Sequence, residues 1–235
     1  REALDCFDRV LASDPDNCGV LNSRGIALQW LNDLDGAEAS YQKILRLDPF
    51  NTLALNNMGA IMRSRALPGK AVEYFDRALA VVPDDGQILF NRSLSLLLAG
   101  DYARGWPGYE NRFRGTPPVI QRHMDIHRWS GESLQGKTIL VWCEQGYGDS
   151  IHFVRYAALL AARGANVVVE AQDERIAPLL EHVNGVEKVV VRGQKRPDVD
   201  YQVPLMSLPG LLGNLPCPPY YLRIDRDEVS RWKAL

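Results

Sequence analysis

The sequence predicts an α plus α/β protein, in which a solenoid of paired helices is followed by a lobe with a parallel sheet. Two observations support this class. The prolines Pro15, Pro49, Pro83 and Pro117 follow one another at intervals of 34 residues, which is a period typical of helical repeats. From Lys137 onward, short β-rich runs alternate instead with helical runs, and this alternation is typical of parallel sheets.

Composition and charge narrow the class of protein. A length of 235 residues is compatible with one or two domains. The 27 basic and 29 acidic side chains give a net charge of −2, so there is no electrostatic reason to expect a nucleic acid or anionic membrane as partner. The longest apolar run, residues 156–162, is far shorter than the roughly 18 residues of a membrane span. Four widely spaced cysteines indicate neither a metal site nor a disulfide framework, and favour a cytoplasmic location.

The first half of the chain divides into helix pairs of constant length. We expect a half unit over residues 1–17, full units over 18–51 and 52–85, and a degenerate unit over 86–117. Pro107, together with Gly105 where alanine is expected, predicts a short or kinked last helix. Two kinds of position recur in register, a small residue on the first helix and an aromatic on the second: Gly25, Gly59 and Ser93, and then Tyr41, Phe75 and Tyr109.

This pattern of small residues, aromatics and a terminal proline resembles the tetratricopeptide repeat, a helix–turn–helix unit of about 34 residues. The resemblance extends over about residues 1–117. It implies a solenoid with a concave groove lined by the first helices. Residues 1–17 match only the second helix of a unit, so its first helix is expected upstream.

A peptide-binding groove is expected on those first helices. Asn57 and Asn91 are in register, with Asn22 and Asn56 beside them. Amide side chains both donate and accept hydrogen bonds, so a column of them can pair with an extended peptide backbone. Similar asparagine columns occur in the repeat arrays of protein O-GlcNAc transferases. The alternative is that these asparagines are ordinary solvated residues. The predicted groove residues are Asn57 and Asn91 for the backbone, with Trp30, Arg63 and Phe90 as side-chain anchors.

A linker is expected over residues 118–136. Its Trp129 and Leu134 should pack onto the following domain. His123 and His127 are four residues apart, as two ligands on one helix face would be, but no third ligand is apparent and we predict no metal site.

The second domain is expected over residues 137–235. Predicted strands at 138–143, 166–170, 187–191 and 201–203 alternate with helices at 149–163 and 174–183. This order predicts a doubly wound parallel sheet of Rossmann type. The loop after Cys143 should then lie at the carboxyl edge of the sheet, where such folds bind ligands.

That loop has the sequence Glu-Gln-Gly-Tyr-Gly-Asp-Ser. We expect Glu144, Gln145, Gly146 and Gly148 to contact a ligand, because the glycines allow a tight turn and a close approach to backbone N–H groups. The third glycine of the dinucleotide fingerprint is missing. Asp149 is expected to be the N-cap of the following helix.

A longer string is more informative. The motif Trp129-x-Gly-Glu-x-Leu134, the segment from Glu144 to Tyr156 and the segment from Pro204 to Pro209 resemble bacterial repeat proteins fused to a glycosyltransferase domain. That domain is similar to the heptosyltransferases and, more remotely, to the O-GlcNAc transferases. The resemblance implies the first lobe of a two-lobe enzyme, with Asp149 as the base that deprotonates an acceptor hydroxyl and His152 beside it.

The same resemblance implies a nucleotide sugar as donor, bound mainly by a second lobe. Residues 1–235 are therefore expected to bind no cofactor and to show no turnover, as a fragment of a sugar transferase whose repeats bind a protein. The alternative is a non-catalytic tetratricopeptide scaffold for protein–protein interaction.

Overall fold

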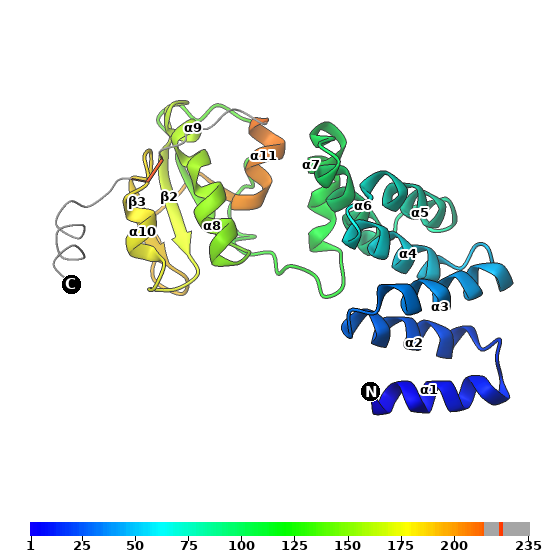
Figure 1. Cartoon of the computed structure of the whole chain (residues 1–235). Coiled ribbons are helices and arrows are strands. Elements are labelled where there is room, and N and C mark those ends of the chain that lie inside the picture. Colours follow the sequence, from blue (N-terminus) through cyan, green and yellow to red (C-terminus); the bar gives the residue numbers. More distant parts are fainter. Residues whose placement is uncertain (214–220, 223–235) are drawn as a thin grey trace. The chain divides into compact units, whose positions relative to one another are not determined.

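The computed structural model describes residues 1–213 and 221–222. The chain forms two compact units, residues 1–119 and 120–235. The first is helical and the second contains a parallel sheet, so the predicted α plus α/β class is confirmed (Figure 1). Among the described residues, no helix combines the length and apolar character that a membrane crossing requires.

Seven α-helices build the first unit, and successive helices pack in antiparallel pairs (Figure 1). The second helices of the units are longer than the first, except in the last unit. The helices are α1 (Glu2–Ser13), α2 (Cys18–Trp30), α3 (Leu34–Leu47), α4 (Thr52–Ser64), α5 (Pro68–Val81), α6 (Gly86–Leu98) and α7 (Tyr102–Tyr109), followed by the 3-10 turn η1 (Glu110–Phe113).

The 34-residue period reappears in the helix ends. Asn17, Asn51 and Asp85 are the N-caps of α2, α4 and α6, and each side chain accepts a hydrogen bond from the backbone N–H three residues on, at 2.9–3.1 Å. Such caps satisfy an N–H that the helix itself leaves unpaired. The turn that follows each of these helices contains a residue with positive φ at the same register: Asn32, Ala66 and Gly100.

The core of the first unit is built on contacts between small and aromatic residues. A Cβ on Gly25 would lie 2.5 Å from Cε1 of Tyr41, and one on Gly59 would lie 2.6 Å from Cε1 of Phe75. Both rings are fully buried. The glycines therefore let the second helix of each pair approach the first closely enough to bury the ring.

The last repeat is shortened, as Gly105 and Pro107 predicted. Helix α7 has 8 residues, compared with 14 in α3 and α5, and Pro107 lies inside it. A Cβ on Gly105 would lie 2.6 Å from Cδ2 of Leu97, so the glycine permits close packing of α7 on α6. Tyr109 takes the aromatic position and is buried.

The second unit has a four-stranded parallel sheet of order β3-β2-β1-β4. The strands are β1 (Thr138–Trp142), β2 (Asn166–Ala171), β3 (Lys188–Val191) and β4 (Tyr201–Pro204). The chain runs from β1 outward to β3 and then returns to the other side of β1. The strand order therefore reverses between β1 and β4, and such a reversal is where open α/β sheets bind ligands.

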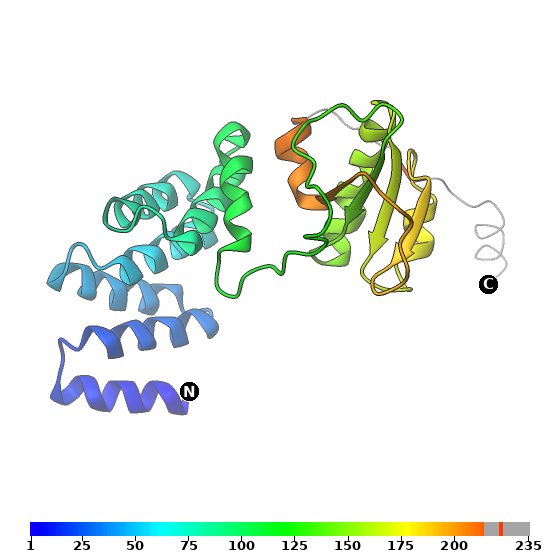
Figure 2. The same ribbon diagram turned by 180° about the vertical axis from the view of Figure 1, so that it is seen from behind.

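The two faces of this sheet differ. The helices α8 (Tyr147–Phe153), α9 (Ala157–Ala161), α10 (Ala177–Glu181) and α11 (Leu208–Leu212) bury the main apolar core against one face. Residues 120–128, which contain no helix or strand (Figure 2), lie against the opposite face, where Ile126 packs against Leu140, Val168 and Val190. We call this segment the strap.

The strap lies within the predicted linker, residues 118–136. It pairs with the edge of β4, because Gln202 N–H donates to His127 C=O at 3.0 Å and Trp129 N–H donates to Gln202 C=O at 2.9 Å. Trp129 and Leu134 are both 2% exposed within the main core, which confirms their predicted packing onto the second domain.

Two expected helices differ from those observed. The segment predicted as one helix over 149–163 starts earlier, at Tyr147, and is interrupted by the 3-10 turn η2 (Val154–Tyr156). The helix predicted over 174–183 is reduced to the five residues of α10, with Pro178 in its first turn. The helix over 149–163 was predicted from apolar residues at helical spacing, and such spacing indicates burial, which a 3-10 turn satisfies equally well.

Candidate functional site

The predicted groove asparagines are joined into two pairs that connect neighbouring first helices. Asn57 Nδ2 donates to Asn22 Oδ1 at 2.8 Å, joining α4 to α2, and Asn91 Nδ2 donates to Asn56 Oδ1 at 3.0 Å, joining α6 to α4. In each pair the two asparagines are 35 residues apart in the sequence. The sequence brought out the register of Asn57 and Asn91, but not that each amide pairs with the asparagine one position earlier in the preceding unit.

Arg63 lies beside the second pair. Its Nη1 donates to the backbone C=O of Asn91 at 3.1 Å. The side chain is half-buried, and burial lowers the pKa of the guanidinium below its usual value. All five predicted groove residues thus lie on the first helices α2, α4 and α6, and the structure joins two of them directly, Arg63 and Asn91.

The two aromatic anchors have different environments. Trp30, at the C-terminal end of α2, is 86% exposed and makes no hydrogen bond or ring contact among the described residues. Phe90 is half-buried instead, with its ring edge-on to Tyr109 at a centroid distance of 5.4 Å. Leu53, in the first turn of α4, is 64% exposed and was missed by the sequence analysis because an isolated leucine carries no motif.

In the second unit, the loop at the carboxyl end of β1 is held by its own side chains and by β2. Asp149 Oδ2 accepts the Gly146 N–H at 3.2 Å. Gln172, just after β2, donates from Nε2 to the Gln145 carbonyl at 2.8 Å and to Ser150 Oγ at 2.6 Å. The expectation that Asp149 is the N-cap was wrong. Gly146 occupies that position, and Asp149 is the third helical residue reaching back to it.

The two loop glycines are not required by the backbone. Gly146 has φ −71°, and a Cβ on Gly148 would meet nothing within 4 Å. The tight turn from β1 to α8 is present, but it uses no backbone conformation that only glycine adopts, and the close approach of a ligand to these glycines stays a prediction. Glu144 turns away from the loop: its Oε1 accepts the backbone N–H of Met206 at 3.2 Å, joining the ends of β1 and β4.

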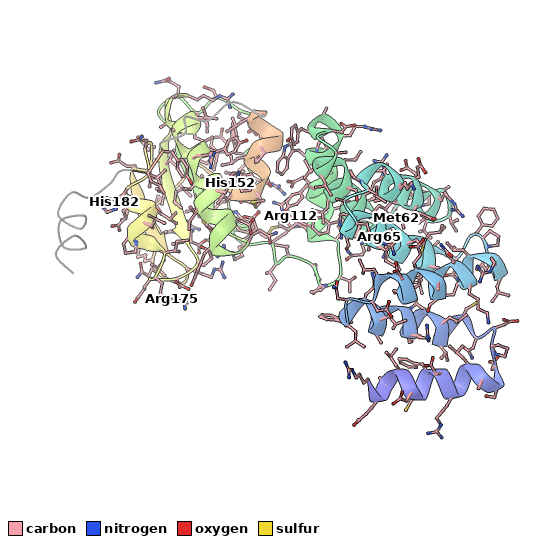
Figure 3. The ribbon with its side chains drawn as sticks, in the orientation of Figure 1. Met62, Arg65, Arg112, His152, Arg175 and His182 are labelled. Carbon is pink, nitrogen blue, oxygen red and sulfur yellow. The ribbon has the colours of Figure 1, made fainter. Side chains whose placement is uncertain are left out.

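His152 lies on the exposed surface of α8 (Figure 3). Its Nδ1 is 3.1 Å from Nη2 of Arg155. Partial burial, followed by the neighbouring Arg155 charge, lowers the pKa of the imidazole, so the neutral form is favoured. Asp149 and His152 share the helix, but no hydrogen bond between them is present.

A charged cluster under the strap was missed by the sequence analysis. Glu170, at the end of β2, is 5% exposed; its carboxylate contacts Arg122 Nη1 at 3.0 Å and His123 Nε2 at 2.6 Å. Arg122 and Arg192 both donate to the Cys143 carbonyl, at 3.1 and 2.8 Å. These partners are 21 to 49 residues apart in sequence, so no local spacing reveals them. The cluster anchors the strap to the sheet.

The two histidines of the strap serve different carboxylates. His123 contacts Glu170, whereas His127 contacts Glu132 Oε1 at 2.9 Å. Their four-residue spacing does not bring them to a common ligand, because no helix forms there: the chain turns after His123, which has a positive φ of 57°, and Ile126 N–H donates to His123 C=O at 3.0 Å.

Comparison with known proteins identifies the first unit. The family described as "Tetratricopeptide repeat" matches residues 1–52 and 66–114. The chain is 28% identical over 186 residues to Protein FlbA of Caulobacter vibrioides, covering 77% of this chain and 31% of that protein. This match is longer than the first unit, so it includes part of the second. The chain is also 34% identical over 87 residues to Protein O-mannosyl-transferase TMTC1 of Homo sapiens.

The chain spans 31% and 10% of the length of these two relatives. Among solved structures, MamA from Desulfovibrio magneticus RS-1 is 22% identical, with a TM-score of 0.44 over 47% of this chain and 62% of that chain. The 34-residue helix pairs and the two matched ranges together show that the first unit of this chain is made of tetratricopeptide repeats.

Proposed function

We propose that the chain is a protein–protein interaction scaffold, whose first helices α2, α4 and α6 bind an extended segment of a partner. The observation that carries this proposal is the pair of amide bridges, Asn57 to Asn22 and Asn91 to Asn56, on adjacent first helices. Repeat solenoids use the extended surface formed by stacked units for binding.

Three of the four bridge residues, Asn22, Asn56 and Asn57, are half-buried and keep hydrogen-bonding capacity for a ligand, whereas Asn91 is 9% exposed. An amide side chain has two N–H donors and a carbonyl with two lone pairs, and each bridge uses one N–H and one lone pair. The bridge also fixes both side chains, so less conformational entropy is lost when a peptide binds. Fixed amides of this kind suit a peptide backbone, which offers alternating donors and acceptors.

Besides amides that pair with a peptide backbone, a binding groove needs apolar side chains that anchor the partner's side chains, and the first helices carry two exposed ones. Trp30 is 86% exposed and Leu53 is 64% exposed, on first helices α2 and α4. Tryptophan is among the residues that contribute most to binding at protein interfaces. Backbone pairing with few anchors predicts a groove that is tolerant of partner sequence.

The test is selection of peptides from a random display library on the purified chain, followed by competition with a soluble peptide. We expect Asn57→Ala and Trp30→Ala each to reduce retention of the selected peptides. Gln42→Ala is the matched control, because it removes an exposed amide that bonds Glu38 within the second helix α3. Selected peptides that bind Asn57→Ala and Trp30→Ala as well as the unaltered chain would contradict the proposal.

Sugar transfer is a second candidate, and one observation favours it. Helix α8 begins just after β1, beside the point between β1 and β4 where the strand order reverses, and Asp149 is its third residue. The comparisons add only the partial match to a protein named as an O-mannosyl-transferase. The test requires a protein in which these residues are followed by a donor-binding lobe. If Asp149 is the base, Asp149→Asn lowers turnover by roughly 10²–10⁴-fold, whereas unchanged turnover removes it from the chemistry.

A further inference from the structure

The face of the sheet that the strap covers ends in three large side chains at the carboxyl edge. Each lies two positions after one of the apolar residues that contact Ile126 of the strap, and side chains two apart on a strand share a face. They are Trp142 of β1, Glu170 of β2 and Arg192, the first residue after β3. Because these strands are adjacent and parallel, the three positions lie at one edge of the sheet.

Arg122 of the strap is fixed at the same edge. Its Nη1 donates to Glu170 Oε1 at 3.0 Å, and its Nη2 donates to the Cys143 carbonyl at 3.1 Å. The guanidinium also lies over the Trp142 ring, 4.8 Å from the ring centroid. Glu170 is buried, whereas the Arg122 side chain keeps 19% of its surface exposed. A guanidinium held in this way loses little freedom when it binds a ligand.

A second guanidinium reaches the same carbonyl oxygen. Arg192 is exposed, and its Nη2 donates to the Cys143 carbonyl at 2.8 Å. The Nη2 atoms of Arg122 and Arg192 are therefore both within hydrogen-bond distance of one oxygen, near enough for a single small anion to contact both groups. Unlike Arg122, Arg192 makes no ion pair among the described residues.

The two positive charges act against each other. Burial lowers the pKa of Arg122; the carboxylates of Glu170 and, more weakly, Glu144 oppose this shift, whereas the charge of Arg192 adds to it. Glu170 is shared, because its other oxygen contacts His123 Nε2 at 2.6 Å. An anion bound between the two guanidiniums would therefore remove a repulsion that the described carboxylates leave in part uncompensated.

The free donors of the two arginines suit a phosphate group. A guanidinium has five N–H donors, of which Arg122 uses two and Arg192 uses one toward the described residues. One planar fork of donors occupies both oxygens of a carboxylate, whereas a phosphomonoester offers three oxygens and up to two negative charges, enough for two forks. The chain's net charge of −2 gives no general attraction for a polyanion, which favours a small ligand.

We propose that Arg122 and Arg192 bind the phosphate group of a small phosphomonoester at the carboxyl edge of the sheet. Because Arg122 belongs to the strap and Arg192 follows β3, the bound phosphate also holds the strap against the sheet. This site lies in the second unit and does not depend on the peptide groove of the first helices.

The experiment titrates phenyl phosphate into the full chain at constant ionic strength and records the NMR signals of the arginine Nε–Hε groups. The signals of Arg122 and Arg192 are assigned from their absence in Arg122→Lys and Arg192→Lys. We expect both signals to shift with one dissociation constant. Benzoate, which carries a carboxylate on the same ring, should bind at least about tenfold more weakly, because it can occupy only one fork. Benzoate binding as tight as phenyl phosphate would refute the phosphate assignment.

Variants then assign the binding to these side chains. Arg192→Gln should weaken phenyl phosphate about tenfold or more, as loss of a hydrogen bond to a charged group does, and Arg192→Lys should retain part of the affinity. Arg163→Gln is the matched control, because Arg163 is an exposed arginine of the same unit, just after α9. If Arg192 only anchors the strap, Arg192→Gln lowers the melting temperature and leaves the dissociation constant unchanged, which would overturn the proposal.

Hydrogen exchange tests the effect on the strap. The N–H groups of Ile126 and Gln202 donate to strap carbonyls, those of His123 and His127. Phenyl phosphate should slow the exchange of both in the unaltered chain and have no effect in Arg192→Gln. Exchange that phenyl phosphate leaves unchanged in the unaltered chain would refute the link to the strap, and a titration that shifts neither arginine signal would refute the site itself.

Discussion

The ring of Phe75 packs directly over Gly59, so closely that a Cβ on the glycine would lie 2.6 Å from the ring atoms Cε1 and Cζ. Tyr41 and Gly25 make the same contact one repeat earlier. In the third repeat the small residue is Ser93, and Gly108 makes room for it: a Cβ there would lie 2.9 Å from Ser93 Cβ. The close approach of the two helices thus recurs in all three repeats, although different residues make the contact in the third.

Gly59→Ala should destabilise the first unit. A methyl group would push the fully buried Phe75 ring out of place, and overpacking of this kind costs about 1–3 kcal/mol, partly offset by the higher helix propensity of alanine, about 1 kcal/mol. Chemical denaturation followed by circular dichroism measures the change. Gly69→Ala is the control, because nothing lies within 4 Å of its added Cβ. Equal midpoints for the two variants would contradict the packing described.

Ala66→Gly should stabilise the first unit. Ala66 has a φ of 56° in the turn between α4 and α5, a conformation that costs an alanine about 1 kcal/mol relative to glycine. The same register holds Gly100 with φ 81°. Thermal unfolding should show a higher midpoint for Ala66→Gly and a lower one for Ala60→Gly, which puts glycine inside α4. A lower midpoint for both would mean that residue 66 is not left-handed.

Asp149 should contribute to stability through its bond to Gly146. Asp149→Ala removes the acceptor of that N–H and should cost about 0.5–1.5 kcal/mol. Asp149→Asn keeps a side-chain oxygen at the same place and should retain most of the stability. Urea denaturation of both variants distinguishes them, and a loss as large in Asp149→Asn as in Asp149→Ala would show that charge, rather than hydrogen bonding, is what matters.

Cys143 should resist alkylation in the folded protein. Burial raises the pKa of its thiol to about 12, so almost no thiolate, the reactive form, is present at pH 8. Cys6 is exposed and should react first. Mass spectrometry of iodoacetamide-treated protein, with and without urea, measures the two sites. Equal rates at Cys6 and Cys143 without urea would contradict the buried position of Cys143.

The repeats could be predicted from sequence because their contacts are local and recur. Each Gly-to-aromatic contact spans 16 residues and appears at the same register, so periodicity alone reveals it. The strands of the second unit were also predicted to within one residue at each end, since buried parallel strands are continuous apolar runs.

The site was less predictable. The bond from Glu144 to Met206 and the cluster around Glu170 join residues far apart in sequence, and nothing in their local pattern indicates their partners. Asp149 shows the opposite failure: an acidic residue after glycine is typical of an N-cap, but the helix starts two residues earlier because Asp149 can reach back to Gly146 from the third position.

The central claim, that the amide bridges bind an extended partner segment, is tested most directly by the dissociation constant of a display-selected peptide for Asn57→Ala and for Gln42→Ala. Removing Asn57 also breaks its bridge to Asn22, at a stability cost of about 0.5–1.5 kcal/mol, so both proteins are measured well below their melting temperatures. We predict that Asn57→Ala weakens binding at least about fivefold and that Gln42→Ala leaves it unchanged. Equal dissociation constants for Asn57→Ala, Gln42→Ala and the unaltered chain would contradict the claim.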